Sequence, residues 1–175
     1  CWEAYIEDTV SAALDFVITH STDPSRIPKS VIERVTSSKQ GPKAWELAGE
    51  GWKLCLRDNL SAVLAKTTGT LNTPRANQVD DLFLKVLGMG AISSTWKWNA
   101  VASDKIVKRL DQLITTRAEI AHRVKHSKTV YKKSVRDAVD LVGRLSARIN
   151  NETRKHVHTL VGKYPWRAIT YKGTA

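Results

Sequence analysis

Apolar residues recur at helical spacing along most of this chain, and that periodicity limits the folds open to it more than any other feature does. The clearest case is the stretch 106–114, where apolar residues occupy positions 106, 107, 110, 113 and 114. This spacing aligns them along one stripe of an α-helix. A similar stripe opens the chain, at Trp2, Tyr5, Ile6, Val10, Ala13, Phe16 and Val17. The pattern predicts an all-α helical bundle with long first and last helices.

Prolines and glycines divide the region between these two stripes into shorter elements. Pro24 and Pro28 break the chain after the first helix. We expect a short helix over 30–35, a long one over about 43–66, and another that begins at Asn77 or Asp80 and runs to Leu87. Gly49 and Gly51 weaken the middle of the long helix, and Gly88 ends the one after it.

The C-terminal part predicts a long helix followed by a tail. The helix begins at about Thr129, buries Val135, Val139, Val142, Leu145 and Ile149, and turns Arg136, Arg144 and Arg148 outward. Trp166 and Tyr171 of the tail either dock on the fold or contact a partner. We expect one domain over 1–160 and a tail over 161–175. The chain does not begin with Met, which indicates either a piece of a longer protein with an adjoining domain or the removal of a tag.

Two tryptophans precede the helix around 106–114. Trp96 and Trp98 lie in a stretch without clear periodicity. One interpretation is that they line the core, and the other is that they stack on nucleic-acid bases.

The segment from Arg117 to His122 carries the chemistry, because it puts a permanent cation and a titratable imidazole five positions apart. A neutral His can take the proton of a ribose 2′-OH, and Arg can hold the phosphate, so such a pair can cleave RNA without a metal. DNA lacks that hydroxyl and would resist. The other interpretation is an exposed Arg and a helix-terminal His that binds carbonyls of the last turn.

The two side chains cannot converge on one small ligand from a single ideal helix. At about 100° per residue they point roughly 140° apart. A partner helix or a break near His122 is therefore implied. Ala118 and Ala121 keep the helix slim, so the same helix of a second subunit could approach closely and bring two Arg and two His into one cleft.

The chain resembles the HEPN superfamily of small helical domains, and most closely the RiboL-PSP-HEPN family. The resemblance lies in the order of several segments over about residues 1–160: Trp2–Asp8, Leu71–Pro74, Asp80–Met89, Trp96–Trp98 and Leu110–His122. It implies a HEPN-like helical bundle that acts as a dimeric, metal-independent endoribonuclease with Arg117 and His122 in the active cleft. Such domains commonly act in toxin–antitoxin or phage-defence systems, so a cognate antitoxin is an expected partner.

One position departs from the family pattern. Family members usually carry Asn or another polar residue directly after the Arg, whereas this chain has Ala118. Glu119 is a candidate supporting group, or an exposed helix carboxylate. The alternative function is therefore a catalytically inactive member of the same fold that binds RNA or a protein.

Positive charge gathers directly after the motif. Residues 123–175 hold 13 Lys and Arg against 3 acidic residues, whereas residues 1–122 hold 15 against 14. Clustered cations beside a phosphodiester site are typical of RNA binding. We expect the loop residues Arg123, Lys125, His126 and Lys128 to contact RNA phosphates. A basic DNA-binding module is a third reading, but no short helix-turn-helix pattern accompanies it.

Other classes of function find little support. No apolar run approaches the roughly 18 residues needed to span a membrane, and the two cysteines form neither a disulfide framework nor a metal-ligand set. His122 and His126 lack a third ligand nearby, and no phosphate-binding glycine loop or nucleophile elbow occurs. We therefore expect no metal and no cofactor, no membrane association, and a cytoplasmic location.

Overall fold

The computed structural model describes residues 2–36, 47–58, 74–98, 101–121 and 131–173, and helices dominate them. The named elements are α1 (Trp2–His20), η1 (Pro24–Arg26), α2 (Lys29–Thr36), α4 (Ala76–Leu87), η3 (Ile92–Thr95), α5 (Ser103–Ala121) and α6 (Lys132–Val161). Across these ranges the only β-type pairing is an isolated bridge between Trp98 and Val101. The predicted all-α fold with long first and last helices is confirmed. No helix among these residues is long and apolar enough to cross a membrane.

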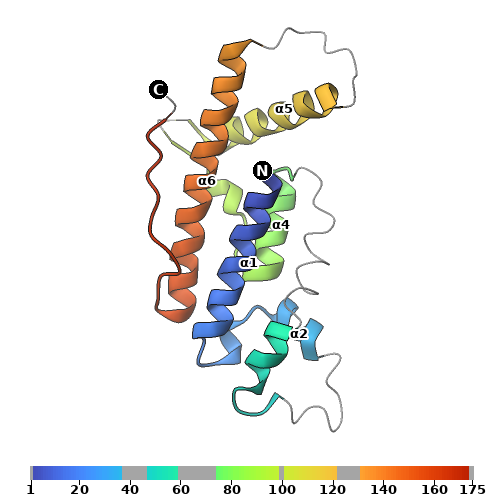
Figure 1. Ribbon diagram of the computed structural model, residues 1–175, viewed down its shortest axis with the longest axis vertical. Coiled ribbons are helices and arrows are strands. Elements are labelled where there is room, and N and C mark those ends of the chain that lie inside the picture. Colours follow the sequence, from blue (N-terminus) through green and yellow to red (C-terminus); the bar gives the residue numbers. More distant parts are fainter. Residues whose placement is uncertain (1, 37–46, 59–73, 99–100, 122–130, 174–175) are drawn as a thin grey trace.

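Helices α1, α4 and α6 form the body of the fold (Figure 1). α1 packs against both α4 and α6. Its apolar stripe is fully buried at Ile6, Val10 and Val17, as the spacing predicted. Tyr5 ties α1 to α6, because its hydroxyl donates a hydrogen bond of 2.7 Å to the carbonyl of Ser146. Burial raises the pKa of that phenol, so it remains a donor at neutral pH.

The short helix η3 and Trp96 join the body to α5. η3 contacts α4, α5 and α6, and Ile92 and Trp96 are fully buried. The Trp96 ring meets Trp2 edge to face at a centroid distance of 6.3 Å. Asp80 of α4 fixes the start of η3 by accepting bonds from the backbone N–H and the hydroxyl of Ser93. The core interpretation is therefore confirmed for Trp96, whereas Trp98 is only partly buried.

The long helix predicted over 43–66 is wrong at 47–50. These residues form a short turn, and the helix begins only at residue 51 and is described to residue 58. Gly49 has a φ of +59°, a left-handed conformation that ends regular α-helix geometry. Leu54 of the predicted stripe is exposed, whereas Leu56 is buried. The remaining parts of the predicted helix, 43–46 and 59–66, lie outside the described residues.

The predicted burial of α6 is wrong over its first turns. Val135 and Val139 are each 53% exposed, and burial starts only at Leu141 and continues with Leu145 and Ile149. The helix has the expected periodicity, but its first turns extend beyond α1, the helix against which the rest of α6 packs (Figure 1).

The C-terminal tail docks along α6. Gly162 ends α6 in a left-handed conformation with a φ of +72°. The Trp166 indole donates to the carbonyl of Asn150 at 3.2 Å, and Arg154 donates to the carbonyl of Trp166 at 2.8 Å. Further along, Tyr171 lies over Gly143, where a Cβ would overlap the ring. Docking on the fold is thus the interpretation that holds for both aromatic residues.

Gly143 and Tyr171 should be energetically coupled. In a Tyr171→Ala background, Gly143→Ala should stabilise the helix by up to about 1 kcal/mol, because alanine is the better helix former. With Tyr171 present, the new methyl group displaces the ring, so the two effects should differ by about 1–2 kcal/mol. Urea unfolding of the parent, the two single variants and the double variant, followed by circular dichroism, measures this coupling. Equal effects in both backgrounds would show that the ring does not pack on Gly143.

Candidate active site

The motif helix α5 is anchored by its first three turns. Ile106, Leu110 and Ile114 are buried at four-residue intervals, and α5 contacts η3 and α4 through this half. Arg75, at the start of α4, adds an ion pair of 2.8 Å to Asp111. Both partners are substantially exposed, so the pair contributes little stability. Apolar burial therefore fixes the direction in which α5 leaves the body.

Beyond Ile114, α5 continues without a buried residue. Arg117, Ala118, Ile120 and Ala121 are all exposed, and Ile120 keeps 50% of its surface in solvent. The prediction that the motif rides on a helix is confirmed as far as Ala121. Arg117 thus sits on a stretch of α5 that extends past the core.

The beginning of α6 is exposed in the same way. Besides Val135 and Val139, Tyr131 directly before the helix is 66% exposed. The last turn of α5 and the first turns of α6 both stand clear of the helical body (Figure 1). We call these two stretches, 115–121 and 131–139, the projecting end. It combines Arg117 with several large apolar side chains that a lone subunit leaves in water.

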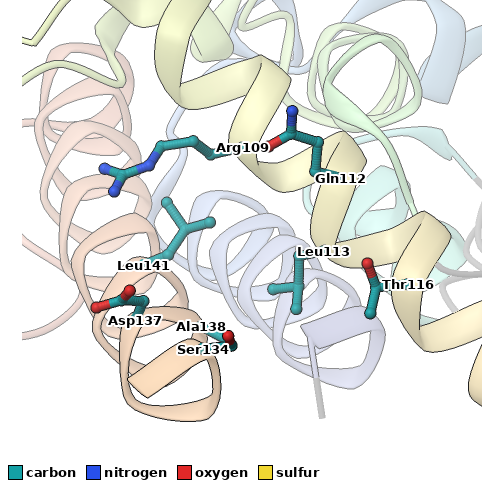
Figure 2. A pocket seen from close by; sticks show the side chains of 8 residues that line it. All are labelled: Arg109, Gln112, Leu113, Thr116, Ser134, Asp137, Ala138 and Leu141. Carbon is teal, nitrogen blue, oxygen red and sulfur yellow. The ribbon is translucent and has the colours of Figure 1, made fainter. Parts of the chain in front are cut away.

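A pocket of about 280 Å³ lies between α5 and α6, next to the projecting end. α5 contributes Arg109, Gln112, Leu113 and Thr116, and α6 contributes Ser134, Asp137, Ala138 and Leu141 (Figure 2). Guanidinium, amide and hydroxyl groups all donate hydrogen bonds, as a phosphate or ribose requires. Asp137 is paired with Lys133 at 3.0 Å, which offsets its negative charge. The pocket therefore combines hydrogen-bond donors with the carboxylate of Asp137.

The structure describes two of the predicted site residues, Arg117 and Glu119. Arg117 is exposed on α5, and Glu119 is partly buried two positions later. His122, Arg123, Lys125, His126 and Lys128 lie outside the described residues, so their predicted roles stay predictions. The convergence of Arg117 and His122 likewise stays a prediction.

Sequence reasoning missed the pocket residues that adjoin the motif. Arg109 and Thr116 are seven positions apart, which is two helical turns, so both lie on one face of α5. That spacing was visible in the sequence. Their partners Ser134 and Asp137 were not predictable, because they come from another helix whose approach is set by tertiary packing.

Within the described residues, no group of three or more His, Cys, Asp or Glu is arranged to hold a metal ion. Nε2 of His156 donates a hydrogen bond of 2.8 Å to the carbonyl of Leu87, and His158 stacks on Tyr164. Both imidazoles therefore have structural contacts within the bundle.

Comparison with known proteins identifies the class. The model of the RiboL-PSP-HEPN family matches residues 1–154, which is most of the chain, and the chain therefore belongs to that family. HEPN domains are often ribonucleases, so membership makes RNA cleavage the leading candidate function. Neither a curated protein nor a solved structure matches the chain.

Substitutions at Arg117 and at Ile114, one turn apart on α5, should differ in their effect on the free energy of unfolding. Arg117→Gln should change the free energy of unfolding by less than about 1 kcal/mol, because the side chain is exposed beyond the buried stripe. Ile114→Ala, one turn earlier, should cost about 2–4 kcal/mol, because it empties a buried site. Urea unfolding of both variants tests the contrast. Comparable losses would mean that the end of α5 packs into the core.

Proposed function

We propose that this chain is a metal-independent endoribonuclease that cleaves single-stranded or looped RNA and leaves 2′,3′-cyclic phosphate ends. The observation that carries the proposal is the position of Arg117. It is exposed on the projecting end of α5, five positions before His122, in a chain that belongs to the RiboL-PSP-HEPN family. An exposed Arg can reach a polymeric phosphodiester, which a buried one could not.

The proposed reaction needs two side chains. His122 takes the proton of the ribose 2′-OH, and the 2′-oxygen then attacks the adjacent phosphorus. A bond from the 2′-oxygen to phosphorus forms, the bond to the 5′-oxygen breaks, and the departing 5′-oxygen is protonated. Arg117 binds the phosphate through its guanidinium and stabilises the negative charge that accumulates in the transition state.

The charge distribution supports RNA as the substrate. The chain carries a net charge of +11, and residues 123–175 account for +10 of it, as 13 basic minus 3 acidic residues. In the described part of that region, Lys132, Lys133 and Arg136 are exposed on the first turns of α6. The predicted contacts of Arg123, Lys125, His126 and Lys128 would extend the same basic surface. Cations placed this way attract a polyanion along its backbone.

A second copy of the chain is the partner that we propose for the projecting end. Ala118 and Ala121 present a slim, exposed helix surface, and Ile120 beside them is half exposed. Two such helices could pack closely about a two-fold axis. This arrangement also answers the geometric problem of the motif, because it brings the Arg of one copy and the His of the other into one cleft.

The biological setting that we propose is a toxin or phage-defence effector in the cytoplasm. An unrestrained ribonuclease would harm its own cell, so a cognate antitoxin or an adjoining domain is the expected restraint. Family membership supports this setting.

The rival function is a catalytically inactive domain that binds RNA or a protein through the same surface. Ala118 favours it, because the usual polar residue after the Arg is missing. The intact spacing of Arg117 and His122 favours catalysis. The two functions differ in one observable, which is whether RNA is cut.

Cleavage should depend on His122 but not on metal. Incubated with total RNA in EDTA, the parent protein should generate new 3′ ends that carry cyclic phosphate, because the 2′-oxygen is the nucleophile. His122→Ala should lose this activity while keeping RNA affinity within about threefold, since the basic surface that binds the backbone is unchanged. Mapping the 3′ ends checks the first result, and filter binding checks the second. RNA binding without cleavage by the folded parent would support the inactive-domain rival.

Dimerisation should depend on the apolar part of the projecting end. Ile120→Asp should weaken self-association at least about thirtyfold, because it puts a charge into a buried contact, and cleavage should fall with it. Leu84→Asp is the matched control, since Leu84 of α4 is similarly exposed, at 54%, but lies far along the chain from the motif. Light scattering after gel filtration measures the mass. A parent that cleaves RNA as a monomer would contradict the two-copy site.

A further inference from the structure

We propose that a second pocket, on the side of α6 that carries the tail, binds a nucleotide through its aromatic base and its phosphate. The pocket has a volume of about 240 Å³, and Trp98, Arg144, Arg148, Asn151 and Tyr171 are among its lining residues. Ligand sites for drug-sized molecules usually start near about 300 Å³. At about 240 Å³ the pocket lies just below that range, so it has room for no more than one nucleotide.

Trp98 supplies a face for the base. It is partly buried against the core and also lines the pocket. An antiparallel bridge pairs Trp98 with Val101, and the backbone N–H of Val101 donates to the carbonyl of Trp98 at 2.8 Å. Because the Trp98 side chain packs against the core, it loses little freedom on stacking. Stacking accepts any base, because every base has a π face.

Two arginines supply the positive charge for a phosphate. Arg144 and Arg148 were predicted to face outward, but both are only partly exposed, with 27% and 37% of their side-chain surfaces in solvent. Asp140 accepts a bond of 2.7 Å from Nε of Arg144, which leaves the N–H groups on both Nη atoms as further donors. This bond raises the pKa of Arg144. Arg148 is oriented by a bond of 2.6 Å from Nη2 to the carbonyl of Lys97.

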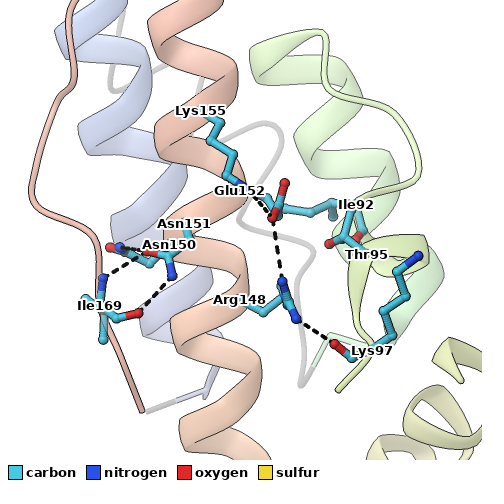
Figure 3. A network of polar contacts seen from close by, with 9 residues as sticks. All are labelled: Ile92, Thr95, Lys97, Arg148, Asn150, Asn151, Glu152, Lys155 and Ile169. Carbon is cyan, nitrogen blue, oxygen red and sulfur yellow. Dashed lines mark hydrogen bonds and ion pairs between the residues drawn. The ribbon is translucent and has the colours of Figure 1, made fainter. Parts of the chain in front are cut away.

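The acidic residues near the arginines are already engaged. Asp140 pairs with Arg144, and Glu152 lies 3.0 Å from Lys155 and 3.9 Å from Arg148. Figure 3 shows how Glu152 connects Lys155 to Arg148, and how Arg148 in turn reaches the carbonyl of Lys97. Asp140 thus orients the Arg144 guanidinium, and neither Asp140 nor Glu152 is among the residues that line the pocket.

The tail forms the remaining wall and fixes the width of the pocket. The Asn151 side chain makes two hydrogen bonds to the backbone of Ile169 (Figure 3). Its Nδ2 donates to the Ile169 carbonyl at 2.8 Å, and its Oδ1 accepts from the Ile169 N–H at 2.9 Å. Tyr171 then lies on Gly143 with its ring 5.6 Å from the Arg144 guanidinium. The buried Tyr171 hydroxyl has no hydrogen-bond partner among the described residues. The wall is therefore built by specific contacts.

The pocket is separate from the candidate active site. The Trp98–Val101 segment directly precedes α5, whereas Arg117 lies 14 residues into that helix, a rise of about 20 Å. The nucleotide can come from two sources with the same chemistry: one residue of a bound RNA strand, or a free mononucleotide. The proposal does not depend on cleavage, so it stands or falls independently of the ribonuclease function.

The test is a binding titration of the parent chain with two probes in parallel. One is adenosine 5′-monophosphate, and the other is a 2′-O-methyl RNA pentamer, which lacks the free hydroxyl needed for cleavage. Calorimetry measures both affinities. Trp98→Leu keeps apolar bulk against the core but removes the stacking face, and Arg144→Gln removes the charge. Each of these two substitutions should weaken binding of the probe that occupies the pocket at least about fivefold. Arg26→Gln, an exposed arginine of η1 outside both the pocket and the proposed RNA surface, should weaken it less than twofold.

The outcomes are distinct. If the pocket variants lose affinity for the pentamer alone, the ligand is a residue of an RNA strand. If they lose affinity for adenosine 5′-monophosphate, the ligand is a free nucleotide. Circular dichroism checks the fold, and if Trp98→Leu fails to fold, Arg144→Gln alone decides. If neither probe binds the parent, or if Arg144→Gln weakens binding no more than Arg26→Gln does, the proposal is overturned.

Discussion

The burial of Trp96 and Ile92 between α4, α5 and α6 is the interaction on which the position of the candidate active site depends. Both side chains are fully buried, and Trp96 meets Trp2 at the start of the chain. Because this contact joins the first helix to the segment that leads into α5, it fixes where α5 starts. Ile106, Leu110 and Ile114 then fix the direction in which it runs. The projection of Arg117 past the core is a consequence of these contacts.

The projecting end suggests how stability and function are divided in this fold. Residues up to Ile114 of α5 and from Leu141 of α6 are held by apolar burial, whereas the stretches between them expose Ile120, Val135 and Val139. A lone subunit gains nothing from leaving such side chains in water. The same stretches carry Arg117 and the exposed lysines of α6.

Helical periodicity predicted the elements of the fold well, because burial against a body of helices acts on a whole stripe. It succeeded for α1, for the end of α4 at Gly88 and for α5. It failed for Val135 and Val139. Their spacing is helical, but the part of α6 that carries them extends beyond α1, the helix on which α6 packs. It also failed at 47–50, where Gly49 adopts a left-handed conformation. Periodicity reports which residues share a face, and it cannot report where the partner helix stops.

The candidate site was predictable to a smaller extent. The spacing of Arg117 and His122 could be seen in the sequence, and the helix that carries Arg117 was expected. The pocket between Arg109 and Asp137, and the one between Trp98 and Tyr171, join segments that are far apart in the chain. Their residues have no shared local pattern, so only the tertiary structure brings them together.

The most direct test of the central claim uses a short DNA strand with a single ribonucleotide, incubated with the purified protein in EDTA and analysed by mass spectrometry. Attack by the 2′-oxygen predicts one cut, directly after the ribose, with a 5′ fragment one water lighter than the corresponding 3′-phosphate. The all-deoxy strand should remain intact. Cleavage of that strand, or cleavage of the ribose-containing strand only after a divalent metal is added, would contradict the account.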